Sequence, residues 1–487
     1  FRRVLFRSKS SEFKSTESFV LLSLDLAIES LVAVVLLLLV VLQPAKSKVN
    51  AATEATASIF LCFICFPLPF TLTIRFFFII TKEKITNQWN FYKISYRKGV
   101  DHFCFFCYNV SRYIIMFYNL GGNHMGKLGI SIYPERSTFE KDKAYLDLAH
   151  KYGFKRVFTS LLQINDDREK VLAEFKKVVD YANQLGMEVM VDINPALFEQ
   201  LGISYDDLSF FHDMGAYGIR LDLGFTGQEE ANMTRNPYGI KIEINMSSGT
   251  SYVDNIMAYS PNTENLLGSH NFYPHRYTGL GYDHFVYCSE KFRKYNLNTM
   301  AFVNSHDATF GPWPTQDGLC SLEDHRDLEI ATQVKHLVLT GLIDDISVGN
   351  AYASEAELAA MAEAFHAPYP SIKVDTEPEI TEDERIALFD NLHSYRGDRS
   401  DYVLRSTMTR VYYKDRPFPA HTTRDIVRGD VLIDNVGYGQ YKGETQIALK
   451  EMKNDGRVNV VGRISDDERF LLEFLKPWSS FKLIENK

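Results

Sequence analysis

The sequence predicts a (β/α)8 TIM barrel followed by a smaller β-rich domain, and two observations indicate this fold class. From residue 125 onward, eight short runs of β-branched and aromatic residues alternate with charged amphipathic segments over about 240 residues. Around residues 366–384 the alternation stops, and short strand-like runs with turn signals follow. A doubly wound sheet is the alternative for the alternating part, but eight units in this length favour a closed barrel. We therefore expect a barrel domain at 125–366, a linker at 367–384 and a β-rich domain at 385–487.

The barrel strands are expected where the apolar runs are short and rich in β-branched residues. Such runs are typical of strands, and nearly every one ends in polar residues. They occupy residues 127–133, 155–162, 188–194, 217–223, 240–246, 269–274, 298–304 and 344–350.

Amphipathic segments separate these runs and predict helices. In residues 170–186 the apolar side chains recur at i, i+3 and i+4, and the segment stops at Gly186, a residue type that commonly ends helices. The expected helices occupy residues 140–153, 167–186, 205–215, 282–296, 328–341 and 354–367.

The last part of the chain predicts a small β-rich barrel. The preceding segment is rich in proline and acidic residues, which is typical of a linker. Asn-Asp-Gly at 454–456 lies between two strand-like runs and is a strong hairpin signal. The strand-like runs occupy residues 401–408, 427–435, 444–452, 453–464 and 470–475.

Residues 1–124 differ in composition from the rest. They contain 14 Lys and Arg and 7 Asp and Glu, which leaves 39 and 55 for residues 125–487. Their apolar stretches at 31–42 and 59–80 read literally as one or two membrane spans, the second interrupted by prolines and an arginine. The interpretation we favour is a sequencing artefact together with translated upstream sequence. Residues 2–8 resemble the read-through of a sequencing adaptor, and Leu-Gly-Gly shortly before Met125 can be encoded by a ribosome-binding site. We expect no native folded domain there and exclude the segment from fold reasoning.

The composition after Met125 narrows the function classes. The excess of acidic residues speaks against general nucleic-acid binding. Of the cysteines, Cys288 and Cys320 remain there, too few for a disulfide framework, which fits a reducing cytoplasm. Metal-binding motifs such as HExxH and cofactor motifs such as GxGxxG are missing from the sequence. We therefore expect a cytoplasmic protein without metal or cofactor, and a homo-oligomer stays open.

Two aspartates are the sharpest candidates for catalysis. In a (β/α)8 barrel, functional groups stand where strands end. Asp192 and Asp222 lie near the ends of neighbouring strands, which are about 4.8 Å apart. Two carboxylates at this spacing suit the acid and the base or nucleophile of glycoside hydrolysis, and their repulsion would raise one pKa. Glu135, after the first strand, is the third candidate. The alternative is a structural carboxylate bonded to Arg220 or to a loop N–H group.

Nearly every predicted strand ends in hydrogen-bonding groups, as a polyhydroxylated ligand requires. Glu243 lies deeper in its strand, so we expect it to be a buried structural partner of a Lys or Arg. The groups expected to bind substrate are Tyr133, Asn194, Arg220, Asn245, Asn271, Tyr273, Asn304, His306 and Asn350.

The stretch NFYPHRYTGLG at 271–281 predicts an anion site beside a stacking surface. Its aromatic residues offer a face for a sugar ring. Arg276 supplies a guanidinium, and Gly279 and Gly281 bring bare N–H groups to the start of the following helix. A cation next to a helix N-terminus can bind a phosphate or carboxylate. The alternative is a solvated arginine or a salt bridge.

Several long motifs together resemble one family, the bacterial 6-phospho-N-acetylmuramidases. The resemblance covers residues 125 to about 480, in order, and none of the residues before Met125. The motifs are MGKLGISIYPE, VDINP, IRLDLGF, NFYPHRYTGLG, FVNSHD, GPWPTQDGLCSLEDHR and DIVRGDVLIDNVGYGQYKGE.

The resemblance implies a (β/α)8 barrel with a cyclophilin-like β domain. It also implies a cytoplasmic hydrolase that splits N-acetylmuramic acid 6-phosphate–(β1→4)–N-acetylglucosamine during peptidoglycan recycling, with this phosphorylated disaccharide as its small-molecule partner. Two other hypotheses stay open. One is a sugar-phosphate aldolase or isomerase on the same barrel, and the other is a membrane-tethered surface protein whose anchor is the N-terminal segment.

Overall fold

The computed structural model describes residues 126–161, 171–193, 198, 202–308, 310–315 and 317–486, and the backbone alone of 60–68, 71–79 and 168–170. In the N-terminal part it shows an antiparallel strand pair, β1 (Phe60–Leu68) and β2 (Thr71–Ile79). The remaining expectations for residues 1–124, upstream sequence or a membrane anchor, lie outside the described residues. Of the helices that are described, none combines the length and the apolar character needed to cross a membrane.

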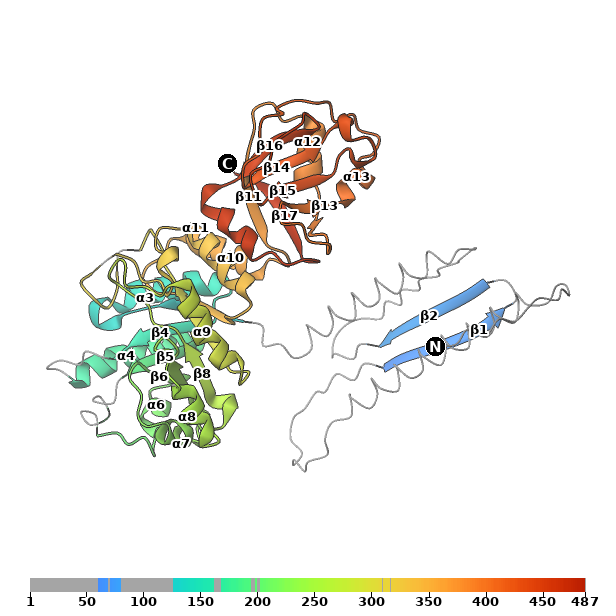
Figure 1. Ribbon diagram of the computed structural model, residues 1–487. Helices are drawn as coiled ribbons and strands as arrows, with labels where there is room; N and C mark the ends of the chain where they lie inside the picture. Colours follow the sequence, from blue (N-terminus) through green and yellow to red (C-terminus); the bar gives the residue numbers. More distant parts are fainter. Residues whose placement is uncertain are drawn as a thin grey trace, which may run out of the picture. The chain divides into compact units, whose positions relative to one another are not determined.

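Eight parallel strands close into a barrel, which confirms the predicted fold class (Figure 1). Each strand pairs with its neighbour in sequence, and β10 closes the ring by pairing with β3. Gly129 makes this closure possible, because a Cβ there would stand 2.1 Å from Ser347 Oγ. The strands are β3 (Leu128–Ser131), β4 (Arg156–Ser160), β5 (Glu188–Ile193), β6 (Gly218–Leu221), β7 (Lys241–Asn245), β8 (Leu266–Ser269), β9 (Asn298–Val303) and β10 (Asp345–Val348).

A helix follows each barrel strand, and the helices surround the strands (Figure 1). Capping residues define where several of them begin. Thr138 accepts a hydrogen bond from Lys141 N at the start of α3, and Ser354 and Glu357 form a capping box on α11. The helices are α3 (Phe139–Lys151), α4 (Arg168–Gln184), α6 (Ser209–Asp213), α7 (Gln228–Met233), α8 (Tyr252–Ala258), α9 (Tyr282–Arg293), α10 (Ile330–Thr340) and α11 (Glu355–His366).

One barrel strand lies earlier than predicted. The run 269–274 was expected to be the sixth strand, but β8 ends at Ser269. Leu266 is fully buried and begins the strand, whereas the following polar and aromatic residues form the loop at the barrel mouth. The expected strand was therefore wrong, and its residues belong to the site rather than to the wall.

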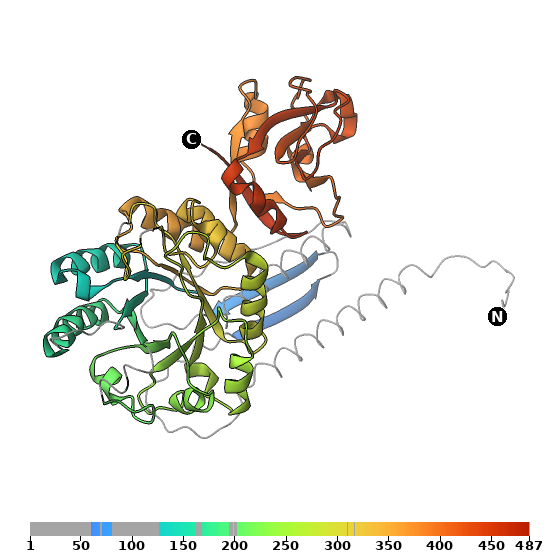
Figure 2. The ribbon, with the colours of Figure 1, turned by 60° about the vertical axis from the view of Figure 1, so that its left-hand side comes forward.

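The second part of the chain contains a seven-stranded sheet with the order β12-β17-β11-β16-β14-β15-β13, coloured orange to red in Figure 2. Its first strand, β11, lies inside the segment 367–384 that was expected to be a linker. Ile372 and Val374 of this strand are fully buried. The proline- and acid-rich composition of the segment therefore led to the wrong prediction of a linker without a strand. The elements are β11 (Ser371–Thr376), α12 (Glu382–Phe389), β12 (His393–Ser394), β13 (Val403–Ser406), α13 (Met408–Tyr412), β14 (Asp430–Asp434), β15 (Thr445–Ala448), β16 (Val458–Ile464) and β17 (Ser480–Glu485).

The hairpin expected at Asn-Asp-Gly 454–456 does not form. Gly456 has a φ of 89°, so the tight turn is present. However, β14 lies between β15 and β16 in the sheet, and it pairs with both of them. The predicted turn is present, but the two strands on either side of it, β15 and β16, do not pair with each other.

A buried carboxylate joins the second sheet to the barrel. Glu468 of the 3-10 helix η5 (Asp466–Glu473) accepts hydrogen bonds from Lys335 Nζ of α10 at 2.6 Å and from Lys373 N of β11 at 2.7 Å. Both charged side chains are almost completely buried. Burial of this pair requires the partners to stay together, because either charge alone would be strongly destabilising.

Candidate active site

A cavity of about 150 Å³ lies where the barrel strands end, the position at which (β/α)8 barrels carry their active sites. Four of the polar residues predicted from the sequence line it. Three further lining residues come from loops, and one, Ser160, is the last residue of β4. The lining residues are Ser160, Asp192, Arg220, Asp222, Asn271, Phe272, Pro312 and Trp313.

Arg220, on β6, connects the polar residues of this cavity. Its Nη1 donates to Asp192 Oδ1 at 2.7 Å and to Asp222 Oδ1 at 3.4 Å. Its Nε donates to Ser269 Oγ at 2.8 Å, and its Nη2 donates to Asn271 Oδ1. One buried guanidinium therefore orients side chains from two strands and two loops.

The two aspartates differ in their surroundings. Only 7% of the Asp192 side chain is exposed, compared with 39% for Asp222. Burial raises the pKa of Asp192 to about 6, against the lowering effect of Arg220 and with a further increase from Asp222 and Glu243. Because both carboxylates bind Arg220 Nη1, their nearest oxygens are at most about 6 Å apart. The site thus pairs a carboxyl group that can keep a proton with a more solvated carboxylate.

A second buried guanidinium lies in the interior of the barrel. Arg156 forms ion pairs with Glu243 and Asp345, which confirms that Glu243 is a structural partner of a basic residue. Glu243 pairs in register with Arg220 on the neighbouring strand. Glu243 thus adds a small further increase to the pKa of Asp192, which burial raises most.

The aromatic wall of the cavity was only partly predicted. Phe272 was expected as a stacking residue, and its ring packs edge to face against Phe158 and Phe302. Pro312 and Trp313, from the loop after β9, were not assigned to the site in advance. A tryptophan between two prolines in a long loop was the available signal in the sequence. In the structure Trp313 is 38% exposed.

Asparagines at the ends of β7 and β8 support the acidic pair. Asn271 lines the cavity beside Arg220. Asn245 Nδ2 donates to the main-chain oxygen of Asp222 at 3.4 Å, and its Oδ1 accepts from Ser247 N. Asn245 therefore positions the backbone of Asp222 through this hydrogen bond.

Several predicted substrate-binding residues form internal hydrogen bonds instead. Tyr133 is fully buried and donates to the Gly349 carbonyl at 2.6 Å. Asn304 bonds to Leu319 N and to the Arg326 carbonyl, and Asn350 bonds to both backbone groups of Ser305. These three side chains fasten segments of the barrel mouth to one another, and their contact with substrate stays a prediction.

Two other predicted residues, His306 and Glu135, do not line the cavity. His306 is exposed and donates from Nε2 to the Arg326 carbonyl at 3.1 Å. Glu135 is exposed in the short helix η1 (Pro134–Arg136), although desolvation by the surrounding protein raises its pKa. Asn194 lies outside the described residues. Among the described residues no cluster of three or more His, Cys, Asp and Glu side chains could hold a metal ion.

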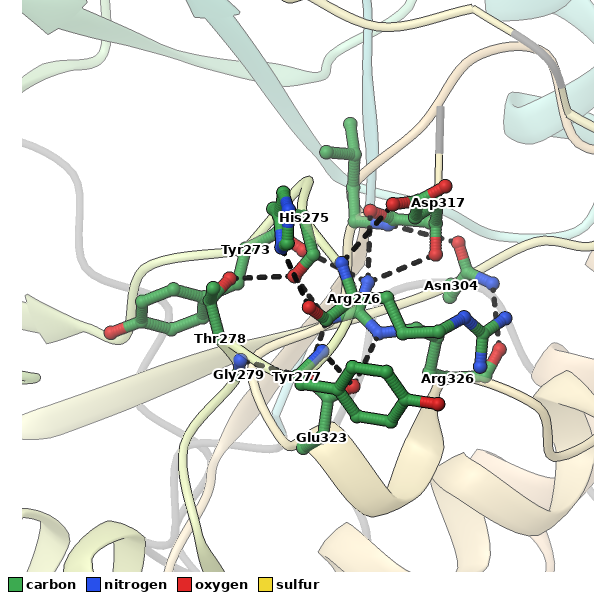
Figure 3. Close-up of polar contacts among 12 residues, drawn as sticks. Tyr273, His275, Arg276, Tyr277, Thr278, Gly279, Asn304, Asp317, Glu323 and Arg326 are labelled. Atoms are coloured by element: carbon green, nitrogen blue, oxygen red, sulfur yellow. Dashed lines mark hydrogen bonds and ion pairs between the residues drawn. The ribbon is translucent and has the colours of Figure 1, made fainter. Parts of the chain in front are cut away.

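The anion site predicted around Arg276 is already filled by groups of the protein. Tyr277 N and Gly279 N both donate to the carboxylate of Glu323 at 2.7 Å, as Figure 3 shows. Arg276 forms a two-pronged ion pair with Asp327. Gly281 is the N-cap of α9, without a side-chain cap. The residue types were therefore right for an anion, but the anion is an internal carboxylate.

Arg326 completes this arrangement and fastens two loops together. It donates to both oxygens of Glu323 and to the main-chain oxygens of Tyr273 and His275 in one loop and Asp317 in the other (Figure 3). Hydrogen bonds from Arg326 and from the two loop amides lower the pKa of Glu323 to about 2. The pair holds the loop that carries Phe272 against the loop that carries Trp313.

The raised pKa of Asp192 predicts a pH-dependent stability. Between its ordinary pKa near 4 and about 6, the folded protein holds a proton that the unfolded chain releases, so the free energy of unfolding falls as pH rises through this window. Asp192→Asn should remove this part of the slope, about 2–3 kcal/mol in total. Urea unfolding at several pH values between about 4 and 7 measures it. A variant with the slope of the wild type would contradict the shift.

Loss of Glu323 should loosen the loops beside the cavity. Glu323→Ala leaves two amides without their acceptor and Arg326 without its carboxylate, so we expect a loss of about 1–3 kcal/mol in unfolding free energy. Asp327→Ala removes only an exposed ion pair and serves as the control, with an expected loss of at most about 1 kcal/mol. Equal losses in the two variants, measured by urea unfolding, would refute the role of Glu323 in holding the two loops together.

Comparisons with known proteins agree with the sequence resemblance. The family models for the N-terminal and C-terminal parts of 6-phospho-N-acetylmuramidase match residues 128–363 and 370–484. An uncharacterized B. cereus protein of known structure is 48% identical, with 74% of this chain and 99% of that chain covered and a TM-score of 0.69. A conserved Enterococcus faecalis protein of unknown function is 26% identical, with coverage of 74% and 96% and a TM-score of 0.59. No curated protein matches. The chain belongs to the 6-phospho-N-acetylmuramidase family.

Proposed function

We propose that the protein is a 6-phospho-N-acetylmuramidase, a glycoside hydrolase that splits N-acetylmuramic acid 6-phosphate–(β1→4)–N-acetylglucosamine in the cytoplasm during peptidoglycan recycling. The observation that carries the proposal is the pair Asp192 and Asp222, held on one guanidinium at the mouth of the barrel. The family membership supports a phosphorylated sugar as substrate. The reaction as proposed requires no cofactor, and the seven-stranded sheet is proposed to be a cyclophilin-like domain.

We assign Asp192 as the proton donor to the leaving sugar. Its pKa of about 6 keeps the proton available near neutral pH, which hydrolysis of a glycosidic bond needs. Asp222, more solvated and next to Arg220, is the carboxylate that meets the positive charge developing on the sugar ring. The separation of at most about 6 Å fits the shorter spacing of retaining enzymes, in which the second carboxylate attacks the sugar or orients its 2-acetamido group.

An aldolase acting through a Schiff base receives no support from the barrel mouth. The segments between each barrel strand and the next helix contain no lysine. A lysine in this position is the nucleophile that such an enzyme needs. The carboxylate pair therefore fits hydrolysis better than carbonyl chemistry.

The direct test is to incubate the purified protein with the phosphorylated disaccharide and to detect the two monosaccharides. We expect cleavage at the glycosidic bond. Failure to cleave this substrate, together with cleavage of a different glycoside, would overturn the substrate assignment.

Substitution of each aspartate should separate the two roles. We expect Asp192→Asn and Asp222→Asn to lower turnover of the disaccharide by about 10²–10⁴. With a nitrophenyl leaving group, which needs no proton, Asp192→Asn should recover most of its activity and Asp222→Asn should not. Asp213→Asn, at an exposed position on α6, is the control for the substitution itself. The same loss with both leaving groups in Asp192→Asn would contradict its assignment as the proton donor.

A further inference from the structure

The barrel mouth must offer a cation to a phosphorylated sugar, and the sequence offers few. The segments between the barrel strands and their helices contain three arginines and no lysine. These arginines are Arg136, Arg276 and Arg326. The segments comprise residues 132–138, 161–167, 194–208, 222–227, 246–251, 270–281, 304–329 and 349–354.

Two of the three arginines are already neutralised by carboxylates. Arg276 is paired with Asp327 through both guanidinium nitrogens. Arg326 is almost completely buried and forms an ion pair with Glu323. Glu323 also accepts hydrogen bonds from the neighbouring loop amides. A phosphate at either position would have to displace a bound carboxylate.

Arg136 differs from both. It ends the short helix η1 after β3, it is exposed, and its Nη1 donates to the Gly311 carbonyl at 2.9 Å. This acceptor is neutral, and among the described residues Arg136 forms no ion pair, although the adjacent Glu135 carboxylate interacts with its charge. Gly311 directly precedes Pro312 and Trp313, which line the cavity. The hydrogen bond thus places Arg136 against the wall of the candidate active site.

A second cation lies on the same side of the mouth. Lys141, in the first turn of α3, is exposed, and its Nζ stands 4.0 Å from the ring centre of Tyr352 and 5.4 Å from that of Phe310. Contact with aromatic faces orients an ammonium group without neutralising it. Phe310 exchanges two backbone hydrogen bonds with Ala351, so the rings belong to a fixed part of the rim.

We propose that Arg136, assisted by Lys141, binds the phosphate monoester of the substrate at the rim formed by the loops after β3 and β9. The inference rests on the proposed function and assigns the group that selects phosphorylated sugars. A guanidinium suits this task because its parallel N–H groups match two phosphate oxygens. The N-terminus of α3, a helix of thirteen residues, lies on the same side, and its positive end favours an anion.

The test compares the phosphorylated disaccharide with the same disaccharide without phosphate. We expect the wild type to prefer the phosphorylated form, and Arg136→Ala to lower kcat/KM for that form by about 10- to 100-fold, mainly through KM. Cleavage of the unphosphorylated form should stay unchanged. Lys141→Ala should act in the same direction with a smaller loss, and Arg136→Lys should restore part of the preference.

Arg235→Ala is the matched control, since Arg235 is exposed and also donates to backbone carbonyls, those of Tyr259 and Ser260, outside the strand-to-helix segments. An unchanged preference for phosphate in Arg136→Ala would overturn the inference while leaving the proposed function intact. The inference also fails if the preference is lost in Arg168→Ala instead, at the first residue of α4. A wild type that cleaves neither disaccharide would refute the proposed function itself.

Discussion

The interaction on which the candidate site depends is the buried guanidinium of Arg220. It bonds to Asp192 on β5, Asp222 after β6, Ser269 on β8 and Asn271 in the loop after β8. A buried arginine is stable only when carboxylates and other acceptors surround it. The need to satisfy this one cation therefore brings the two aspartates together, and it holds them in place before any substrate binds.

The same electrostatics link the stability of the barrel to its chemistry. Arg156 satisfies Glu243 and Asp345 inside the barrel, while Arg220 is shared between Asp192 and Asp222. Burial, and to a smaller extent the neighbouring carboxylates Asp222 and Glu243, raise the pKa of Asp192, the more buried member of the cavity pair. A group that weakens the folded state when it ionises is also a group that can keep a proton for catalysis.

Local patterns predicted the barrel and half of the residues that line the cavity. They failed where contacts between distant segments determine the position of a loop. The alternation of apolar runs and amphipathic segments placed Asp192, Arg220 and Asp222 at strand ends, because side-chain periodicity and strand length are local properties. The walls made by Pro312 and Trp313 depend on how the loop after β9 folds back, which Arg326 controls through carbonyls of another loop. No neighbouring residue signals such a contact.

The sequence by itself determined that a (β/α)8 barrel would form and which polar residues would stand at its mouth, since both follow from short-range patterns of hydrophobicity. Only the tertiary structure decided how those polar groups are used. Tyr133, Asn304 and Asn350 bond to backbone groups of the barrel mouth, and Glu323 takes the amides that an outside anion was expected to bind. A polar side chain bonds to the nearest suitable partner in space, and that partner is set by the packing of loops far apart in the chain.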